Sequence, residues 1–435
     1  MTRGWLAVLV AGVAACSASP AMRAAENGDR ASLRAMIAAR ESRGSLSNRE
    51  AASLARAVAE RELKTTSPGD GVARVRDALP CARELDGALS ARMATHDAAG
   101  AAAALARLDA RGWDLDDARR YAGDTEPAWR AVGARALVRG ADRRARLVAL
   151  VDGSPLVRRE AVRAMRDAAD AADVRPLSET ARLDPEPIVR TEAVRAMASL
   201  AIAPAGEVAD ALRDLWTAGD DGLREDIALA WSTPWLWKAG GREALRILVA
   251  TGRGPGAVEG AAAALRQPDA GPELASLAVG RLVRSIQAGA RVTRLQAIAE
   301  APLDRAELLD AVRAAAKDSD VQVRIGALHR LAGRAGPDAR AAVEGLEALA
   351  QPGSAVGPQV RFALASAGDR RIQAWLEQDL TSPAPPDRLG AATALADLGV
   401  AARAAPLLDD DDPSVRVRAA CTLLMANRVT RSRSP

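Results

Sequence analysis

Few residues of this chain could carry covalent or metal chemistry. Three cysteines (Cys16, Cys81 and Cys421) and two histidines (His96 and His329) are spread over 435 residues. Neither histidine has a cysteine or the other histidine close by, so no zinc-binding spacing exists. The sequence also contains no G-x-S-x-G, G-x-G-x-x-G or Walker motif. We therefore expect no catalytic residue, no metal site and no cofactor, and we do not expect an enzyme.

The first cysteine follows a short apolar segment at the start of the chain. Arg3 precedes an apolar run over residues 5–13, which is too short for a membrane span of about 20 residues. A basic residue followed by such a run and by small residues favours a signal peptide. Residues 13–16 (VAAC) resemble the lipobox of bacterial lipoproteins, in which an aliphatic and two small residues precede a cysteine.

This resemblance implies that residues 1–15 are removed as a signal peptide and that Cys16 becomes the lipid-carrying N-terminus. Several acyl chains, palmitate among them, would then anchor the protein stably to a membrane. By the family pattern, Ser17 favours the outer membrane of the bacterial envelope. The alternative is an ordinary secretory signal with an incidental cysteine.

The two remaining cysteines could pair in an oxidising compartment. Cys81 and Cys421 are, however, 340 residues apart in the sequence. An open array of repeats would hold them too far apart for a bond that needs Cα atoms within about 7 Å. We expect two free, buried thiols.

The composition favours packed helices. Hydrophobic residues make up 49% of the chain but aromatic residues only 2%, and we count 104 alanines. Alanine is the best helix former, whereas strands prefer β-branched and aromatic residues. The charges nearly balance, with 60 basic and 56 acidic residues and a net charge of +4, so composition gives no argument for nucleic-acid binding.

A motif of the form Asp-x-x-Pro-x-x-Arg recurs along the chain, with valine in place of proline in one copy. The copies are Asp124/Pro127/Arg130, Asp152/Pro155/Arg158, Asp184/Pro187/Arg190, Asp318/Val321/Arg324 and Asp410/Pro413/Arg416. Weaker copies, anchored at Arg224, Glu259, Arg294, Arg361 and Arg388, fill the intervals and give a repeat of about 32 residues. Small and large apolar residues follow each anchor at helical spacing, so each motif predicts a helix with one apolar face. The aspartate is expected to be the N-cap and the proline to lie in the first turn.

The segments DGSPLVRREAVRAM (152–165) and DPEPIVRTEAVRAM (184–197) resemble the HEAT-repeat family, including its bilin-lyase-type members. The resemblance implies an all-α fold: an α-solenoid of about ten two-helix repeats over residues 121–430. It also implies that the motif's aspartates and arginines form a hydrogen-bonded ladder between successive repeats. The alternative for these arginines is a basic concave surface for an anionic partner.

The N-terminal part lacks the motif but looks helical. Residues 16–30 are expected to form the lipidated N-terminus and a linker, and residues 431–435 a disordered tail. Residues 31–120 would form either a helical cap on the array or a separate small domain. Ser47 and Glu50 make a capping box before an expected helix over 48–64, with further helices over 71–93 and 96–110.

Four tryptophans gather where the helical pattern is interrupted by Pro234. They are Trp216, Trp231, Trp235 and Trp237. Indole rings are enriched in binding hot spots, so an exposed Trp235 or Trp237 could form a platform for a peptide or a glycan. The alternative is a local core beneath an irregular repeat.

The acidic run over residues 409–412 has two interpretations as well. Four consecutive carboxylates could bind Ca²⁺, but no Gly-punctuated loop surrounds them. A solvated turn that opens the last repeat is the favoured interpretation.

These features together predict a membrane-anchored, non-catalytic scaffold that binds other proteins of the bacterial cell envelope. Its partners would be those proteins and, through the lipid, the membrane, with no nucleic acid. One alternative is a HEAT-like lyase or chaperone. Another is a nucleic-acid-binding HEAT-like protein, which the export signal argues against.

Overall fold

The computed structural model describes residues 19–41, 46–112, 115–218, 221–351 and 354–433. Over these residues the chain is all-α and contains no strand, as expected. The segment predicted to be a signal peptide, Cys16 and the last two residues lie outside the described residues. No helix within the described ranges has the length and apolar character needed to cross a membrane.

The N-terminal helices are α1 (Pro20–Asn27), α2 (Arg30–Glu41), α3 (Asn48–Thr65), α4 (Pro68–Ala78), the 3-10 turn η1 (Leu79–Cys81), α5 (Asp86–Met93), α6 (Ala98–Arg111) and α7 (Leu115–Ala122). The next are α8 (Pro127–Arg139), α9 (Arg143–Leu150), α10 (Pro155–Asp167), η2 (Ala171–Asp173), α11 (Val174–Leu183), α12 (Pro187–Met197), α13 (Ala205–Ala218), α14 (Asp221–Trp231), α15 (Pro234–Leu236), the π-helical η3 (Trp237–Gly241), α16 (Arg242–Thr251) and α17 (Gly254–Arg266). The last are α18 (Gly271–Ala288), α19 (Arg291–Glu300), α20 (Ala306–Ala315), α21 (Val321–Ala332), α22 (Pro337–Leu349), α23 (Gly357–Ser366), η4 (Arg370–Ile372), α24 (Gln373–Asp379), α25 (Pro385–Asp397), η5 (Ala401–Asp409) and α26 (Pro413–Arg433).

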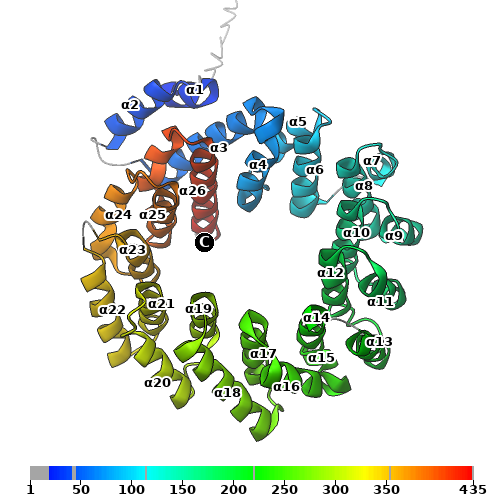
Figure 1. The fold of residues 1–435 in the computed structure, drawn as a ribbon. Helices are drawn as coiled ribbons and strands as arrows, with labels where there is room; N and C mark the ends of the chain where they lie inside the picture. The colour runs from blue at the N-terminus through cyan, green and yellow to red at the C-terminus, as the bar shows by residue number, and fades with distance from the viewer. Residues whose placement is uncertain (1–18, 42–45, 113–114, 219–220, 352–353, 434–435) are drawn as a thin grey trace, which may run out of the picture.

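The helices follow one another around a closed ring, and the C-terminus lies inside it (Figure 1). An inner layer runs in unbroken contact through α4, α6, α8, α10, α12, α14, α17, α19, α21, α23, α25 and α26. The ring closes because α26 also packs against α3 and α4, which lie near the other end of the chain. Residues 31–120, expected to be a terminal cap or a separate domain, therefore contact both α8 and α26 and join the two ends.

One detail of the N-terminal helices agrees with expectation and another differs from it. Ser47 and Glu50 form the capping box at the start of α3, with both reciprocal hydrogen bonds present. The helix expected over 71–93 is instead divided, since α4 ends at Ala78 and α5 begins at Asp86. Pro80, within η1, interrupts the pattern there because it offers no N–H to an α-helical ladder.

The start of each repeat helix differs from expectation in one respect. Pro127, Pro155 and Pro187 occupy the first turns of α8, α10 and α12, as expected. The motif's aspartate is not the N-cap, however, because the N-cap is the residue directly before the proline. The Asp152 carboxylate instead accepts a hydrogen bond from the backbone N–H of Ser154, the N-cap residue, at 2.8 Å. The aspartate thus holds the turn before the helix and leaves its second oxygen free for another partner.

The small residue three positions after each motif arginine lies where helices approach most closely. It is Gly133 in α8, and its alanine counterparts Ala161 and Ala193 are fully buried. A Cβ atom on Gly133 would lie 2.1 Å from the backbone N of Ala122 and 2.6 Å from the carbonyl O of Ala118. Backbone atoms cannot move aside as a flexible side chain can, so α7 and α8 require glycine here.

Gly133→Ala is therefore expected to lower the free energy of unfolding by about 1–3 kcal/mol, the usual cost of overpacking, although alanine favours helices. Urea denaturation followed by circular dichroism would measure it. The matched control is Gly390→Ala in α25, where a Cβ atom meets nothing within 4 Å and stability should stay equal or rise. Equal effects at both positions would contradict the close approach of α7 and α8.

Candidate functional site

The motif arginines and aspartates pair between successive repeats. Arg130 donates two hydrogen bonds to the Asp152 carboxylate, at 2.9 and 3.1 Å. Arg158 does the same to Asp184, at 2.7 and 2.9 Å. Each such pair is here called a rung. The hydrogen bond from Arg130 is the main cause that lowers the pKa of Asp152 below its usual value.

Several motif arginines also bind the turn of their own repeat. Arg158 donates to the carbonyl O of Asp152 at 2.9 Å, so one guanidinium contacts two consecutive motif aspartates. Arg190 and Arg324 likewise donate to the carbonyl O of Asp184 and Asp318, at 3.2 and 2.6 Å. The planar, five-donor guanidinium suits this double task, which lysine could not perform.

Further rungs come from the weaker copies of the motif or from outside it. Among them, Arg361 donates two hydrogen bonds to the Asp379 carboxylate, each at 2.6 Å. Arg294 binds the Asp318 carboxylate, and Arg388 binds that of Asp410 at 2.7 and 2.9 Å. Asp124, the first motif aspartate, lies 2.9 Å from Nε2 of His96. The His96 ring stacks on Trp129 with centroids 4.6 Å apart, which places a histidine where a preceding repeat would supply arginine.

The last rung joins a helix near the C-terminus to a helix near the N-terminus. Arg416 in α26 donates to Oε1 of Glu62 in α3 at 2.9 and 3.0 Å, and both residues are buried. Its third nitrogen binds the carbonyl O of Asp410 at 2.6 Å, as in the other rungs. Glu62 lies outside the repeat motif, so sequence analysis had no reason to select it.

A disulfide joins the same two ends. Cys81 and Cys421 are bonded, with their Cα atoms 5.1 Å apart and both side chains buried. The expectation of two free thiols was wrong because it assumed an open array. In a closed ring, residues 340 positions apart become neighbours once the chain has gone all the way round.

The N-terminal helix α2 binds the acidic run of residues 409–412 through two arginines. Arg30 and Arg34 both bind the Asp409 carboxylate, which is 4% exposed, and Arg30 also binds Asp411. The hydrogen bond from Arg30 lowers the pKa of Asp411. Among the described residues, no cluster of acidic, histidine or cysteine side chains could hold a metal ion. The run is therefore not merely a solvated turn, since it pairs with arginines from the other end of the chain.

We call this contact region the seam: α2, α3, α4 and η1 on one side, η5 and α26 on the other. Two further hydrogen bonds cross it, from the backbone N–H of Ala402 to Oδ1 of Asn48 at 3.0 Å and from Ser414 to the Asp77 carboxylate. The sequence held a weak signal for the seam. Arg30 and Arg34 share one helix face, and the acidic run contains more carboxylates than a single rung uses.

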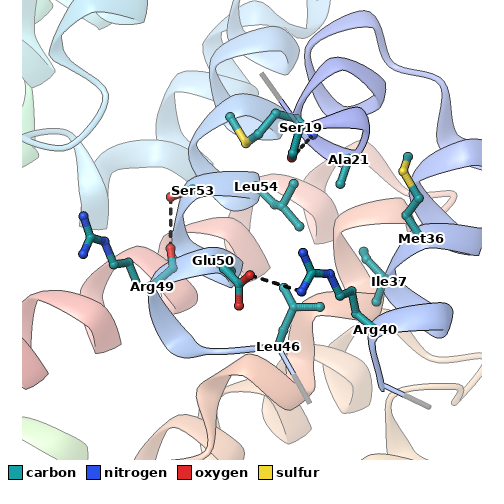
Figure 2. Close-up of a pocket in the computed structure, with 11 residues that line it drawn as sticks. Ser19, Ala21, Met36, Ile37, Arg40, Leu46, Arg49, Glu50, Ser53 and Leu54 are labelled. Carbon is teal, nitrogen blue, oxygen red and sulfur yellow. Dashed lines mark hydrogen bonds and ion pairs between the residues drawn. The ribbon is translucent and has the colours of Figure 1, made fainter. Parts of the chain in front are cut away.

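A small cavity lies beside the seam, between α1, α2 and α3 (Figure 2). Its volume is about 190 Å³, and Ile37, Leu46 and Leu54 give it a mostly apolar lining. At its edge, Arg40 lies 3.6 Å from the Glu50 carboxylate. Hydrogen bonds from the side chain and backbone of Ser47 lower the pKa of Glu50, which keeps this carboxylate ionised.

The tryptophan cluster belongs to the core rather than to a surface. Trp231 and Trp237 are each 4% exposed, and Trp216 and Trp235 are partly buried. Nε1 of Trp235 donates to the carbonyl O of Ala198 at 2.9 Å, so its polar edge is used inside the protein. The hypothesis of an exposed platform is thus contradicted for Trp237 and unsupported for Trp235.

The irregular backbone beside these rings has a local cause. The chain kinks within η3, where Gly240 has a φ of 123°, a conformation that favours glycine. A Cβ atom on the next residue, Gly241, would lie 2.1 Å from the carbonyl O of Trp231. The large rings fill the space that this departure from regular helix packing opens.

No protein-family model matches the chain, and no curated protein matches it either. Among solved structures, the chain is similar to YibA from Escherichia coli, known from an X-ray structure. The two are 15% identical with a TM-score of 0.30, and the match covers 69% of this chain and 97% of YibA.

Proposed function

We propose that this chain is a lipid-anchored, non-catalytic scaffold of the bacterial cell envelope, built as an α-solenoid of HEAT-like repeats closed into a ring. In this proposal Cys16 carries the lipid, the outer membrane is the anchoring membrane, and envelope proteins bind the curved repeat surface. The observation that supports export most directly is the Cys81–Cys421 disulfide. Disulfides persist in oxidising compartments such as the bacterial periplasm and are rare in the cytosol.

The rungs support the repeat part of the proposal. Arg130, Arg158 and Arg388 each pair with an aspartate of the next repeat, as the HEAT resemblance implies. Side chains engaged in this way are poorly suited to the alternative of a basic surface for an anionic partner. A scaffold that repeats one unit offers a long binding surface, and anchoring confines its search for partners to the membrane plane.

The anchor can be tested by labelling growing cells with an alkyne analogue of palmitate. We expect the wild-type protein to be labelled and Cys16→Ala to lose the label completely, because no other residue would carry the lipid. Cys421→Ser is the control and should keep the label. Label that persists in Cys16→Ala would overturn the lipid anchor, whereas unlabelled protein recovered from the periplasm would indicate an ordinary secretory signal.

A further inference from the structure

The seam differs from every other contact between neighbouring inner helices. Elsewhere around the ring, each inner helix is connected to the next by a short stretch of chain. At the seam, α26 packs against α3 and α4 across nearly the whole length of the sequence. The seam is therefore the contact along the inner layer that packing, ion pairs and the disulfide hold together without a connecting segment of chain.

We propose that the seam is a thiol-controlled latch: Glu62 and Arg416 hold the ring closed, and the Cys81–Cys421 disulfide locks it. Thiol exchange would release this lock and allow the two ends of the chain to separate. The proposal rests on the export part of the proposed function, because locking requires an oxidising compartment. The ligand class of this site is a dithiol or disulfide, either a small molecule or an oxidoreductase.

The redox step balances as an exchange. To lock the ring, the two thiols form one S–S bond and pass two electrons and two protons to the disulfide of an oxidant such as oxidised glutathione, which becomes two thiols. To unlock it, a thiolate attacks one of the two sulfurs and forms a mixed disulfide. A second thiol then displaces the protein sulfur, leaving Cys81 and Cys421 reduced.

Burial makes the lock depend on the seam. Cys81 is 0% and Cys421 2% exposed, so an attacking thiolate cannot reach either sulfur in the closed ring. Sγ of Cys421 also lies 3.8 Å from the carbonyl O of Ala78, inside the contact between η1 and α26. The rate of reduction should therefore follow the fraction of molecules in which the contacts around the disulfide are locally open while the bond still joins the two ends.

That fraction is set by the apolar packing of α26 against α3 and α4 and by three main groups of polar contacts. The first is the buried pair of Glu62 and Arg416. The second consists of the ion pairs that Arg30 and Arg34 of α2 form with Asp409. The third is the pair of hydrogen bonds made by Asn48 and Asp77. No short connecting segment joins the two sides of the seam. Once the disulfide is reduced, the two sides can separate when these polar contacts break and the helix surfaces lose their packing.

The test measures reduction of the disulfide in the full-length chain with Cys16→Ala, in which only Cys81 and Cys421 can react. The oxidised protein is incubated with dithiothreitol, quenched and denatured, and free thiols are counted from the gel shift of a maleimide-polyethylene glycol tag. Glu62→Gln weakens the buried contact to Arg416. We expect it to speed reduction about tenfold or more, since a hydrogen bond to a charged group stabilises by roughly that factor.

The matched control is Asp184→Asn, which weakens the same kind of buried rung away from the seam, at Arg158. We expect its reduction rate to stay within about twofold of wild type, because local opening there leaves the sulfurs covered. Equal acceleration by both variants would overturn the latch, and so would reduction of the wild type as fast as oxidised glutathione itself. Either result would leave the lipid anchor and export, tested by palmitate labelling, untouched.

Small-angle X-ray scattering gives a second, independent reading. We expect reduced Glu62→Gln to show a larger radius of gyration than the oxidised variant, with unchanged helix content by circular dichroism. Reduced Asp184→Asn should keep the radius of its oxidised form. An unchanged radius in reduced Glu62→Gln would show that the seam does not open, and a loss of helix content would show unfolding in place of latch opening.

Discussion

Replacing both Cys81 and Cys421 by alanine is expected to lower the free energy of unfolding by about 5 kcal/mol. The bond closes a loop of 340 residues, and the loop-closure entropy of so long a loop corresponds to roughly 6 kcal/mol, above the range of about 0–5 kcal/mol found for disulfides. Alanine is preferred to serine because a hydroxyl buried without a partner would add a cost of its own. Urea denaturation, followed by circular dichroism and tryptophan fluorescence, would measure the change.

Two comparisons distinguish the stability lost with the disulfide bond from the stability lost by changing the side chains. Wild-type protein denatured in the presence of dithiothreitol should lose nearly the same stability, since it keeps both sulfur atoms but not the bond. Cys16→Ala should not change the transition, because residue 16 takes no part in this disulfide. A loss below about 1 kcal/mol in the double variant would mean that the unfolded chain gains little freedom when the ring is cut.

Asp184→Ala is expected to have the next largest effect, about 3–5 kcal/mol of lost stability. The substitution leaves the guanidinium of Arg158, which is 8% exposed, buried without its carboxylate partner. It also removes the acceptor for the backbone N–H of Glu186, at 2.9 Å, which holds the turn before α12. The same urea denaturation measures the loss.

The control is an exposed ion pair that also joins successive inner helices. Arg266 in α17 lies 3.1 Å from the Glu300 carboxylate in α19, with side chains 61% and 37% exposed. Glu300→Ala should cost less than about 1 kcal/mol, because water screens the charges and solvates the arginine left behind. Similar losses from Asp184→Ala and Glu300→Ala would show that burial does not govern the strength of the rungs.

The sequence alone was sufficient for contacts within one repeat and between adjacent repeats. The position of Pro155 in the first turn of α10 and the pairing of Arg158 with Asp184 follow from spacing in the sequence and from the HEAT resemblance. These features are visible because each repeat must present the same surfaces to its neighbours, so the same residue types recur at the same spacing. The prediction that Asp152 is the N-cap was wrong. Aspartate is typical of N-caps, but here it holds the turn before the helix and binds the arginine of the preceding repeat.

The tryptophans needed the tertiary structure. Spacing alone could not tell whether Trp235 and Trp237 face solvent or the core, since Pro234 ends the regular helical pattern from which faces are read. Their burial depends on how α15 and η3 pack against α13 and α14, which are packed in turn against their own neighbours.

By itself, then, the sequence predicted an all-α chain with a recurring motif, and its resemblance to the HEAT-repeat family implied that arginine and aspartate would pair between successive copies. Only the tertiary structure decided that the chain closes, with Glu62 beside Arg416 and Cys81 bonded to Cys421. The reason is physical: the rotation from one repeat to the next is small and is set by packing along the whole helix surface. The ring closes only if these rotations add up to a full turn. That total depends on all repeats together, so it cannot be predicted from any single motif.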